Sequence, residues 1–330
     1  MNAEAQRRRG TQRGKGRVTA TNRVGRAGAL TRRRRGGRGK TERTSQRQIR
    51  RLRGATPLEY VLISVLALFT ILPIVYMVST ALKPLEEMFL YPPRFFVRHP
   101  TLRNFADLLL AIDALAVPFV RYLFNSAFVT AITVTAGLIL SSMAAYPLAK
   151  YPRMPGSKLF FSIVVSTLMF APEVTQIPRY LIVDRLGLID TYAGLILPVI
   201  AGSYGLFLMK QFMEQVPIEL LEAAKVDGAS EWRIFWQVVM PLVRPAWITL
   251  MLLSFISTWN DFFTPLIFTR SEQMKTLPLL MSSIGGGPGV VARYGAVAAA
   301  SLIVTLPTFI LFVFLQRYVM ETMAYSGIKS

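Results

Sequence analysis

The stretch ELLEAAKVDGASEWRIFWQVVMPLVRP runs from Glu219 to Pro245 and differs in character from the chain around it. Of the 330 residues, 52% are hydrophobic, and the mean hydropathy is +0.41. That is more apolar than an ordinary soluble domain. Within the stretch, however, six charged residues fall close together beside two alanines and a glycine: Glu219, Glu222, Lys225, Asp227, Glu231 and Arg233. We therefore expect a charged loop between apolar segments.

The spacing within this stretch predicts a helix, a tight turn and a second helix. A helix over Ile218–Val226 can follow Pro217, because proline is tolerated where a helix begins. Gly228 fits the left-handed position that closes a helix, and Ser230 is a residue type that caps the next one. The second helix carries one apolar face at helical spacing, formed by Trp232, Phe235, Trp236 and Val239. We expect that face to be buried along the membrane interface.

A helix needs about 20 apolar residues to cross the hydrocarbon core of a bilayer. Six segments of the chain qualify, and only two of them contain an acid, Glu173 in the third and Asp261 in the fifth. No alternating strand pattern competes, and backbone polar groups in lipid must be bonded within a helix or a closed barrel. The sequence therefore predicts an all-α polytopic membrane protein with six transmembrane helices: Val61–Leu82, Tyr122–Ala149, Leu159–Pro178, Thr191–Met209, Pro245–Thr269 and Tyr294–Gln316.

Residues 1–56 form a separate, basic segment. They hold 19 of the 38 Lys and Arg residues and two of the 18 acids, so they carry +17 of the net charge of +20. With almost no large apolar residues, this tail is expected to be disordered and to meet water and anionic lipid headgroups rather than nucleic acid. The arginines within 47–53 directly precede the first span and place the N-terminus in the cytoplasm. Six spans across residues 57–330 then return the C-terminus to the cytoplasm, and the charged loop lies on that side.

The composition also excludes several kinds of chemistry. The chain has no cysteine, so it can form neither a disulfide nor a thiolate metal site. Its one histidine, His99, lies in a proline- and arginine-rich segment, so a histidine metal site or proton relay is not expected. We therefore expect a protein that is not an enzyme and that binds no metal or cofactor.

Within the opening stretch, EAAKVDGASEWRIFWQVVMPL closely resembles the EAA motif of ABC-importer permeases. In that family the motif is a cytoplasmic coupling helix that docks in a cleft on an ATPase subunit. The resemblance implies that the loop at 217–241 makes this contact. The matching residues are Glu222, Ala223, Ala224, Asp227, Gly228 and Pro241.

The resemblance extends over residues 57–330 and points to the carbohydrate-importer branch, of the maltose and glycerol-phosphate type. The sequence stretches that show this resemblance are STALKPLEEMF, LRNFADLL, AAYPLAKYPRMPG, STWNDFF and LQRYVMETMAYSGIKS. It implies transport of a di- or oligosaccharide together with a homologous second permease, two ABC ATPase subunits that bind the ATP, and an extracytoplasmic solute-binding protein. The basic tail departs from the family pattern, because such subunits usually begin close to the first span.

An ionisable side chain inside a span is costly and indicates function by default. Asp261 shares one helical stripe with the hydroxyl residues Ser254, Ser257, Thr258 and Thr264. One interpretation is a face along the sugar path, and the other is a helix–helix contact inside the bundle. Glu173, after a proline, is expected at a kinked helix end rather than at the substrate. The path residues are predicted to be Ser257, Trp259, Asn260 and Asp261.

Two alternative functions stay open. Importers of amino acids, phosphate or metal ions share the EAA motif, so the solute could be another small molecule. A membrane-anchored regulator acting through the basic tail is the alternative from a different class. A secondary transporter is disfavoured because the charged loop has no role there.

Overall fold

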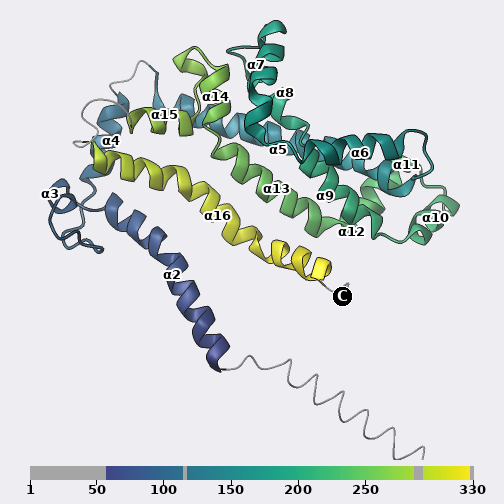
Figure 1. Cartoon of the computed structure of the whole chain (residues 1–330), viewed down its shortest axis with the longest axis horizontal. Coiled ribbons are helices and arrows are strands. Elements are labelled where there is room, and N and C mark those ends of the chain that lie inside the picture. Colours follow the sequence, from purple (N-terminus) through teal and green to yellow (C-terminus); the bar gives the residue numbers. More distant parts are fainter. Residues whose placement is uncertain (1–56, 114–116, 286–292, 328–330) are drawn as a thin grey trace, which may run out of the picture. The chain divides into compact units, whose positions relative to one another are not determined.

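The computed structural model describes residues 57–113, 117–285 and 293–327, which are mostly helical and contain no strand (Figure 1). The predicted basic tail, residues 1–56, lies outside the described residues. The chain divides into two units, residues 1–71 and residues 72–330. Of the first unit, only the beginning of α2 (Pro57–Ala81) is described. The helix packing that follows is that of the second unit.

Three helices are each long and apolar enough to cross a membrane. They are α2, α5 (Phe119–Lys150) and α16, whose described apolar part is Tyr294–Val319 within Tyr294–Gly327. Three further pairs of helices qualify only when each bent pair is counted as one span. The described helices therefore provide three clear spans, and they reach the predicted six only if each bent pair is one span.

The third expected span is interrupted by a proline. Helix α6 (Ser157–Thr167) ends early, a 3-10 turn, η1, covers Pro172–Thr175, and α7 (Gln176–Arg185) leaves at 106° to α6. Ala171 is extended, as expected for a residue before proline. Glu173 lies exposed in the turn, which confirms that it sits at a kink.

The fourth expected span bends by 41° between α8 (Tyr192–Ile200) and α9 (Ser203–Glu214). The two residues between them, Ala201 and Gly202, are not helical. Backbone groups at such a break lose their helical partners, so the break exposes peptide N–H and C=O groups between neighbouring helices.

The fifth expected span is also not one helix. Helix α13 (Arg244–Trp259) stops before Asp261, and α14 (Phe263–Phe268) follows. The Asp261 carboxylate accepts the backbone N–H groups of Phe263 and Thr264 at 2.9 and 3.0 Å. An aspartate side chain that bonds nearby N–H groups competes with a continuous helix, which explains the break.

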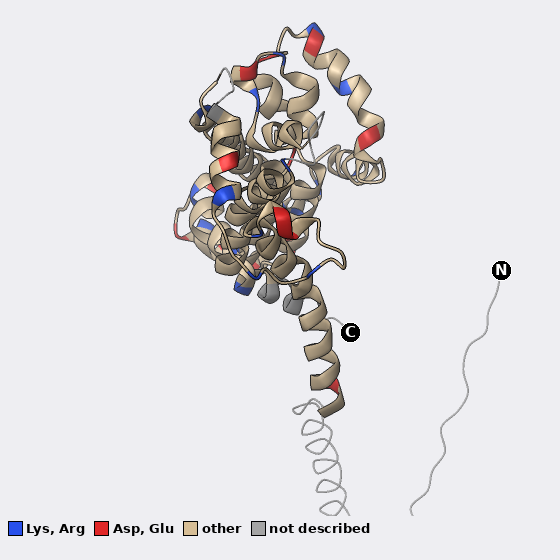
Figure 2. Cartoon of the chain, turned by 90° about the vertical axis from the view of Figure 1, so that its left-hand side faces the viewer, with Lys and Arg blue, Asp and Glu red and all other residues tan. Residues whose placement is uncertain are grey.

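Helices α5, α9, α13 and α16 pack together in the second unit (Figure 1). Close approach between α5 and the α8–α9 bend depends on small residues. A Cβ at Gly137 would lie 3.2 Å from the Ile200 carbonyl oxygen, and one at Gly205 would lie 2.8 Å from the Ser141 hydroxyl. Figure 2 shows that charged residues lie mainly on loops and short helices and leave the long helices nearly uncharged.

Buried polar side chains hold the segment between α2 and α4 (Arg103–Asp113). Lys83 donates to the Arg94 carbonyl at 2.7 Å, and Asn104 donates to the carbonyls of Ala81 and Lys83 at 2.9 and 2.7 Å. In the short helix α3 (Leu85–Met88), Glu87 accepts the N–H groups of two residues farther along this segment, Arg98 and His99. The polar residues of STALKPLEEMF and LRNFADLL therefore have a structural use.

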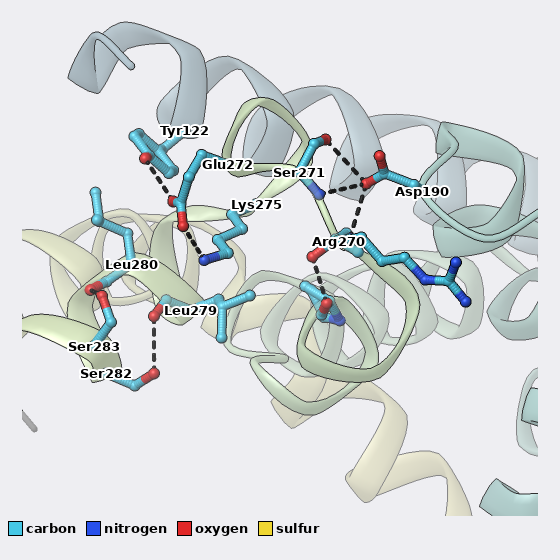
Figure 3. A network of polar contacts seen from close by, with 12 residues as sticks. Tyr122, Asp190, Arg270, Ser271, Glu272, Lys275, Leu279, Leu280, Ser282 and Ser283 are labelled. Atoms are coloured by element: carbon cyan, nitrogen blue, oxygen red, sulfur yellow. Dashed lines mark hydrogen bonds and ion pairs between the residues drawn. The ribbon is translucent and has the colours of Figure 1, made fainter. Parts of the chain in front are cut away.

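A second polar network joins the loop before α8 to the segment after α14 (Figure 3). Asp190, at a left-handed φ of 63°, accepts the N–H groups of Arg270 and Ser271 at 2.9 and 3.0 Å and the Ser271 hydroxyl at 3.0 Å. Burial alone would raise the pKa of Asp190, but these donors hold the pKa below its usual value. Nearby, Glu272 in η3 (Glu272–Met274) pairs with Lys275 and accepts the Tyr122 hydroxyl, just before α15 (Leu277–Ile284).

Candidate functional site

The charged loop begins with α10, which covers Ile218–Val226 as the sequence predicted. The helix closes with the two hydrogen bonds of a Schellman motif. The N–H of Gly228 donates to the Lys225 carbonyl at 3.0 Å, and the N–H of Ala229 donates to the Ala224 carbonyl at 2.9 Å. Gly228 has a φ of 80°, which confirms its left-handed position. Only glycine adopts this conformation without strain, so the turn depends on Gly228.

The second helix begins where predicted but changes its pitch. The Ser230 hydroxyl caps α11 (Glu231–Ile234) by accepting the N–H of Arg233. The next five residues, Phe235–Val239, are π-helical (η2), and the short α12 (Met240–Leu242) contains Pro241. A proline ring clashes with the carbonyl four residues earlier in a regular helix, and a π-bulge relieves that clash.

Three residues of the predicted apolar face lie together, because the rings of Trp232, Phe235 and Trp236 contact one another with centroids 6.1, 5.8 and 4.9 Å apart. Phe235 and Val239 are buried within the chain, whereas Trp232 and Trp236 lie exposed on its surface. Burial of this face along the membrane interface stays a prediction. Helix α13 then leaves at 80° to the segment before it.

Four side chains clasp the loop to α5. Glu231 accepts the Tyr146 hydroxyl at 2.8 Å, the Tyr151 hydroxyl at 2.7 Å and the Lys225 ammonium at 2.6 Å. Lys225 also donates to the Tyr151 oxygen at 2.8 Å. The hydrogen bond to Glu231, and then that to Tyr151, raise the pKa of Lys225, so it stays charged. This clasp, Tyr146, Tyr151, Lys225 and Glu231, ties both halves of the loop to one long helix.

Apolar packing also holds the loop against the neighbouring helices. Leu221 of α10 is 1% exposed and belongs to a buried cluster with Ile234, Phe235 and residues of α5, α9 and α13. The Lys150 ammonium, at the end of α5, donates to the carbonyl of Val216 just before α10. The loop is consequently a rigid extension of the helices and can transmit a displacement to them.

The predicted contact residues lie mostly on the outer surface of this loop. Glu222, Ala223, Asp227, Gly228 and Pro241 are exposed, whereas Ala224 is half-buried and packs on the cluster beneath. Beside them Val226 is 88% exposed.

Three of the four predicted path residues line cavities: Ser257 lines one beside α5, and Trp259 and Asp261 line a smaller one together with Thr258 and Thr264. Trp259 is buried, donates to the Val304 carbonyl of α16 at 2.9 Å and stacks on Phe255. Asn260 donates to the Ile256 carbonyl at 2.8 Å. Asp261 caps α14, as described above. These three side chains therefore also have structural partners.

The sequence reasoning did not single out Tyr146, Lys150 or Tyr151. All three belong to AAYPLAKYPRMPG, a signature noted only as a whole. Three polar residues within six positions, at the end of the uncharged segment Tyr122–Ala149, are the available signal. Within the ranges that the structure covers, no three His, Asp or Glu residues lie close enough together to hold a metal ion.

The comparison with family models identifies the chain. The model described as "Binding-protein-dependent transport system inner membrane component" matches residues 60–323. The chain belongs to this family. It is an inner-membrane component with several apolar helices.

Individual relatives agree with this membership. The arabinooligosaccharides transport system permease protein AraQ of Bacillus subtilis is 31% identical over 83% of this chain and 95% of its own. The sn-glycerol-3-phosphate transport system permease protein UgpE of Yersinia enterocolitica is 35% identical over 61% of this chain and 71% of its own. A chain of a bacterial ABC transporter involved in the import of the acidic polysaccharide alginate superposes with a TM-score of 0.68 at 25% identity, over 79% of this chain and 95% of that one.

Proposed function

We propose that this chain is a permease subunit of an ATP-driven ABC importer that moves a sugar, a di- or oligosaccharide, across the cytoplasmic membrane. The loop at 217–241 couples it to the ATPase subunits. The observation that carries the proposal is the loop itself: a short helix closed by a Schellman turn, clasped to α5, with Glu222, Ala223 and Asp227 exposed.

The shape of the loop suits a rigid contact that transmits force. The small side chain of Ala223 permits close approach of a partner surface, and Glu222 and Asp227 can meet a basic rim on that partner. The clasp and the buried Leu221 prevent the loop from yielding when the partner moves. A displacement of the ATPase surface would therefore reach α5 and α13.

The importer would contain further components. A homologous second permease completes the path, two ABC ATPase subunits bind and hydrolyse ATP, and an extracytoplasmic solute-binding protein delivers the sugar. This chain itself binds no cofactor and catalyses no reaction. Both of its termini lie in the cytoplasm, which agrees with the arginines that precede the first span.

The names of the relatives favour a sugar over other solutes. The similar permeases serve arabinooligosaccharides and sn-glycerol-3-phosphate, and the similar solved structure serves alginate. Import of an amino acid or of inorganic phosphate stays the alternative, and an uptake panel that includes both decides between them.

The coupling role is tested with Gly228→Val in the reconstituted complex. Valine is strained at a φ of 80°, at a cost of about 1–3 kcal/mol, although a Cβ there meets no neighbouring atom. We expect ATP hydrolysis to persist while sugar-stimulated hydrolysis and uptake fall together.

Gly187→Val is the matched control. Gly187 has a φ of 66°, and a Cβ there also meets no neighbouring atom, but it lies in the loop between α7 and α8. Its valine variant should carry a similar strain and keep its coupling. Normal stimulation of Gly228→Val, or equal loss in both variants, would refute the coupling role.

A further inference from the structure

A cavity of about 370 Å³ lies between α5, the α8–α9 bend and α13. Its volume falls within the range of about 300–1,000 Å³ that is typical of small-molecule sites. Its α5 residues, Thr133 to Ser141, lie at and just past the middle of that 32-residue helix. The cavity therefore lies near the middle of α5, away from both of its ends.

The polar side chains of the cavity are all hydroxyls, from Thr133, Ser141, Tyr204, Ser254, Ser257 and Thr258. Thr133 is only 4% exposed, and its hydroxyl has no hydrogen-bond partner among the described residues. A buried hydroxyl without a partner costs about 1–3 kcal/mol. The Thr133 oxygen is closed to solvent in this structure, and rotation about the Cα–Cβ bond of this cavity-lining residue would turn the hydroxyl toward a ligand that supplies the missing partner.

The broken fourth span adds backbone groups to the same cavity. Val199 and Ile200, at the end of α8, and Gly202, Tyr204 and Gly205, around the start of α9, all line it. The last carbonyls of α8 have no partners within that helix, whereas the N–H groups of Gly205 and Leu206 in α9 already donate to the Gly202 carbonyl. The α8 carbonyls are therefore acceptors, and the side-chain hydroxyls of the cavity can donate. The cavity thus offers both acceptors and donors, as a molecule with many hydroxyls requires.

No lining residue of this cavity is charged. A phosphate or a carboxylate placed there would be buried without a counter-charge, which is strongly unfavourable. A neutral sugar ring carries hydroxyls that both donate and accept, and it pays no such penalty. The composition of the cavity therefore favours a neutral solute.

From these observations we propose that this cavity binds a unit of a neutral saccharide during transport, with the Thr133 hydroxyl as one of its direct contacts. The proposal rests on the proposed function and narrows it. It excludes glycerol-phosphate and acidic sugars as solutes for this chain, although similar permeases and structures serve them.

The first test compares Thr133→Val with Thr135→Val in the complete importer. Valine keeps the shape of threonine but removes the hydroxyl, and Thr135 lies exposed on the same helix. Uptake is measured with labelled arabinotriose, raffinose, glycerol-3-phosphate and a uronate trisaccharide. We expect wild-type uptake of a neutral member only. The KM for that sugar should rise roughly fivefold in Thr133→Val and stay unchanged in Thr135→Val.

The second test uses the absence of cysteine from this chain. Ser257→Cys places a single thiol at the cavity, in a complex whose other subunits have had their cysteines replaced. A water-soluble maleimide should label this thiol, and the transported sugar should slow labelling several-fold while an untransported sugar should not. This measurement decides the matter even if Thr133→Val fails to assemble.

The outcomes separate the two proposals. If the wild-type complex takes up none of the sugars, the proposed function fails and the cavity proposal fails with it. If it takes up a neutral sugar, but Thr133→Val behaves as wild type and that sugar leaves labelling of Ser257→Cys unchanged, only the cavity proposal is overturned. Uptake of glycerol-3-phosphate or the uronate by the wild type would overturn the assignment to neutral saccharides.

Discussion

Replacing Glu231 with alanine is expected to loosen the α10–α11 loop while leaving the long helices in place. Glu231 is the centre of the clasp, because it accepts hydrogen bonds from Tyr146, Tyr151 and Lys225. Alanine removes all three bonds at once. It removes no apolar contact of the buried cluster beneath the loop, since Glu231 is exposed.

The magnitude follows from the burial of each partner. The side chains of Lys225 and Glu231 are 43% and 52% exposed, so solvent screens their ion pair and its contribution is small. Tyr151 keeps Lys225 as a partner at 2.8 Å. Tyr146 is 8% exposed, and its hydroxyl would lose its carboxylate partner at about 1–3 kcal/mol. The expected total, mostly from Tyr146, is roughly 2 kcal/mol for local opening of the loop.

Hydrogen exchange of the complex measures this opening directly. A change of about 2 kcal/mol corresponds to roughly a 30-fold loss of protection at the amides of Gly228 and Ala229, which close the Schellman turn. Glu231→Gln retains one acceptor oxygen and should lose less. Glu219→Ala, which replaces an exposed glutamate of α10, should change nothing. Protection that falls less than threefold in Glu231→Ala would refute the clasp.

Two further predictions concern the loops and breaks. Asp261→Asn should leave the melting temperature of the complex unchanged, because asparagine caps a helix as well as aspartate. Asp261→Ala should lower the free energy of unfolding by about 1 kcal/mol. Equal melting temperatures of both variants would show that the cap is not needed. The pKa of Asp190 is lowered in the folded protein, so its stabilising effect is present above the unfolded pKa of about 3.9 and is lost as the pH falls through the folded pKa. Asp190→Asn should therefore show a smaller loss of thermal stability than wild type between pH 5 and pH 3, and an unchanged acid profile would contradict this.

The charged loop was predictable because its signals are local. Helix α10, the left-handed Gly228 and the Ser230 cap each depend on one or two neighbouring residues. The π-helical segment was not predictable in the same way, because the strain that Pro241 imposes can be absorbed by a kink, a break or a bulge.

The broken spans show a different limit. Hydropathy reports that a segment is apolar but not that its helix is continuous, so the breaks at Ala201–Gly202 and around Asp261 passed unnoticed. The predicted polar stripe through Asp261 assumes one helix, but α13 ends at Trp259. Asp261 and Trp259 have local hydrogen-bond partners, and Asp261 still lines a cavity with Thr258 and Thr264.

The cavity could not be derived from sequence, because its lining comes from three separate segments. Ser254, Ser257 and Thr258 were recognised as a polar face of one helix. Thr133 and Gly205 carry no individual signal, and only packing brings them beside that face. The clasp is a similar case, since Tyr146 and Glu231 are 85 residues apart.

The proposed contact between the outer surface of the 217–241 loop and an ATPase subunit can be tested directly by cross-linking. Because the chain contains no cysteine, Glu222→Cys provides one exposed thiol on α10 for a short maleimide–diazirine cross-linker, and Leu266→Cys provides an exposed thiol on α14 as the control. In a complex that hydrolyses ATP and takes up sugar, we expect an adduct between Glu222→Cys and the ATPase subunit, and none from Leu266→Cys. An active complex in which Glu222→Cys forms no adduct with the ATPase would contradict the coupling role of the loop.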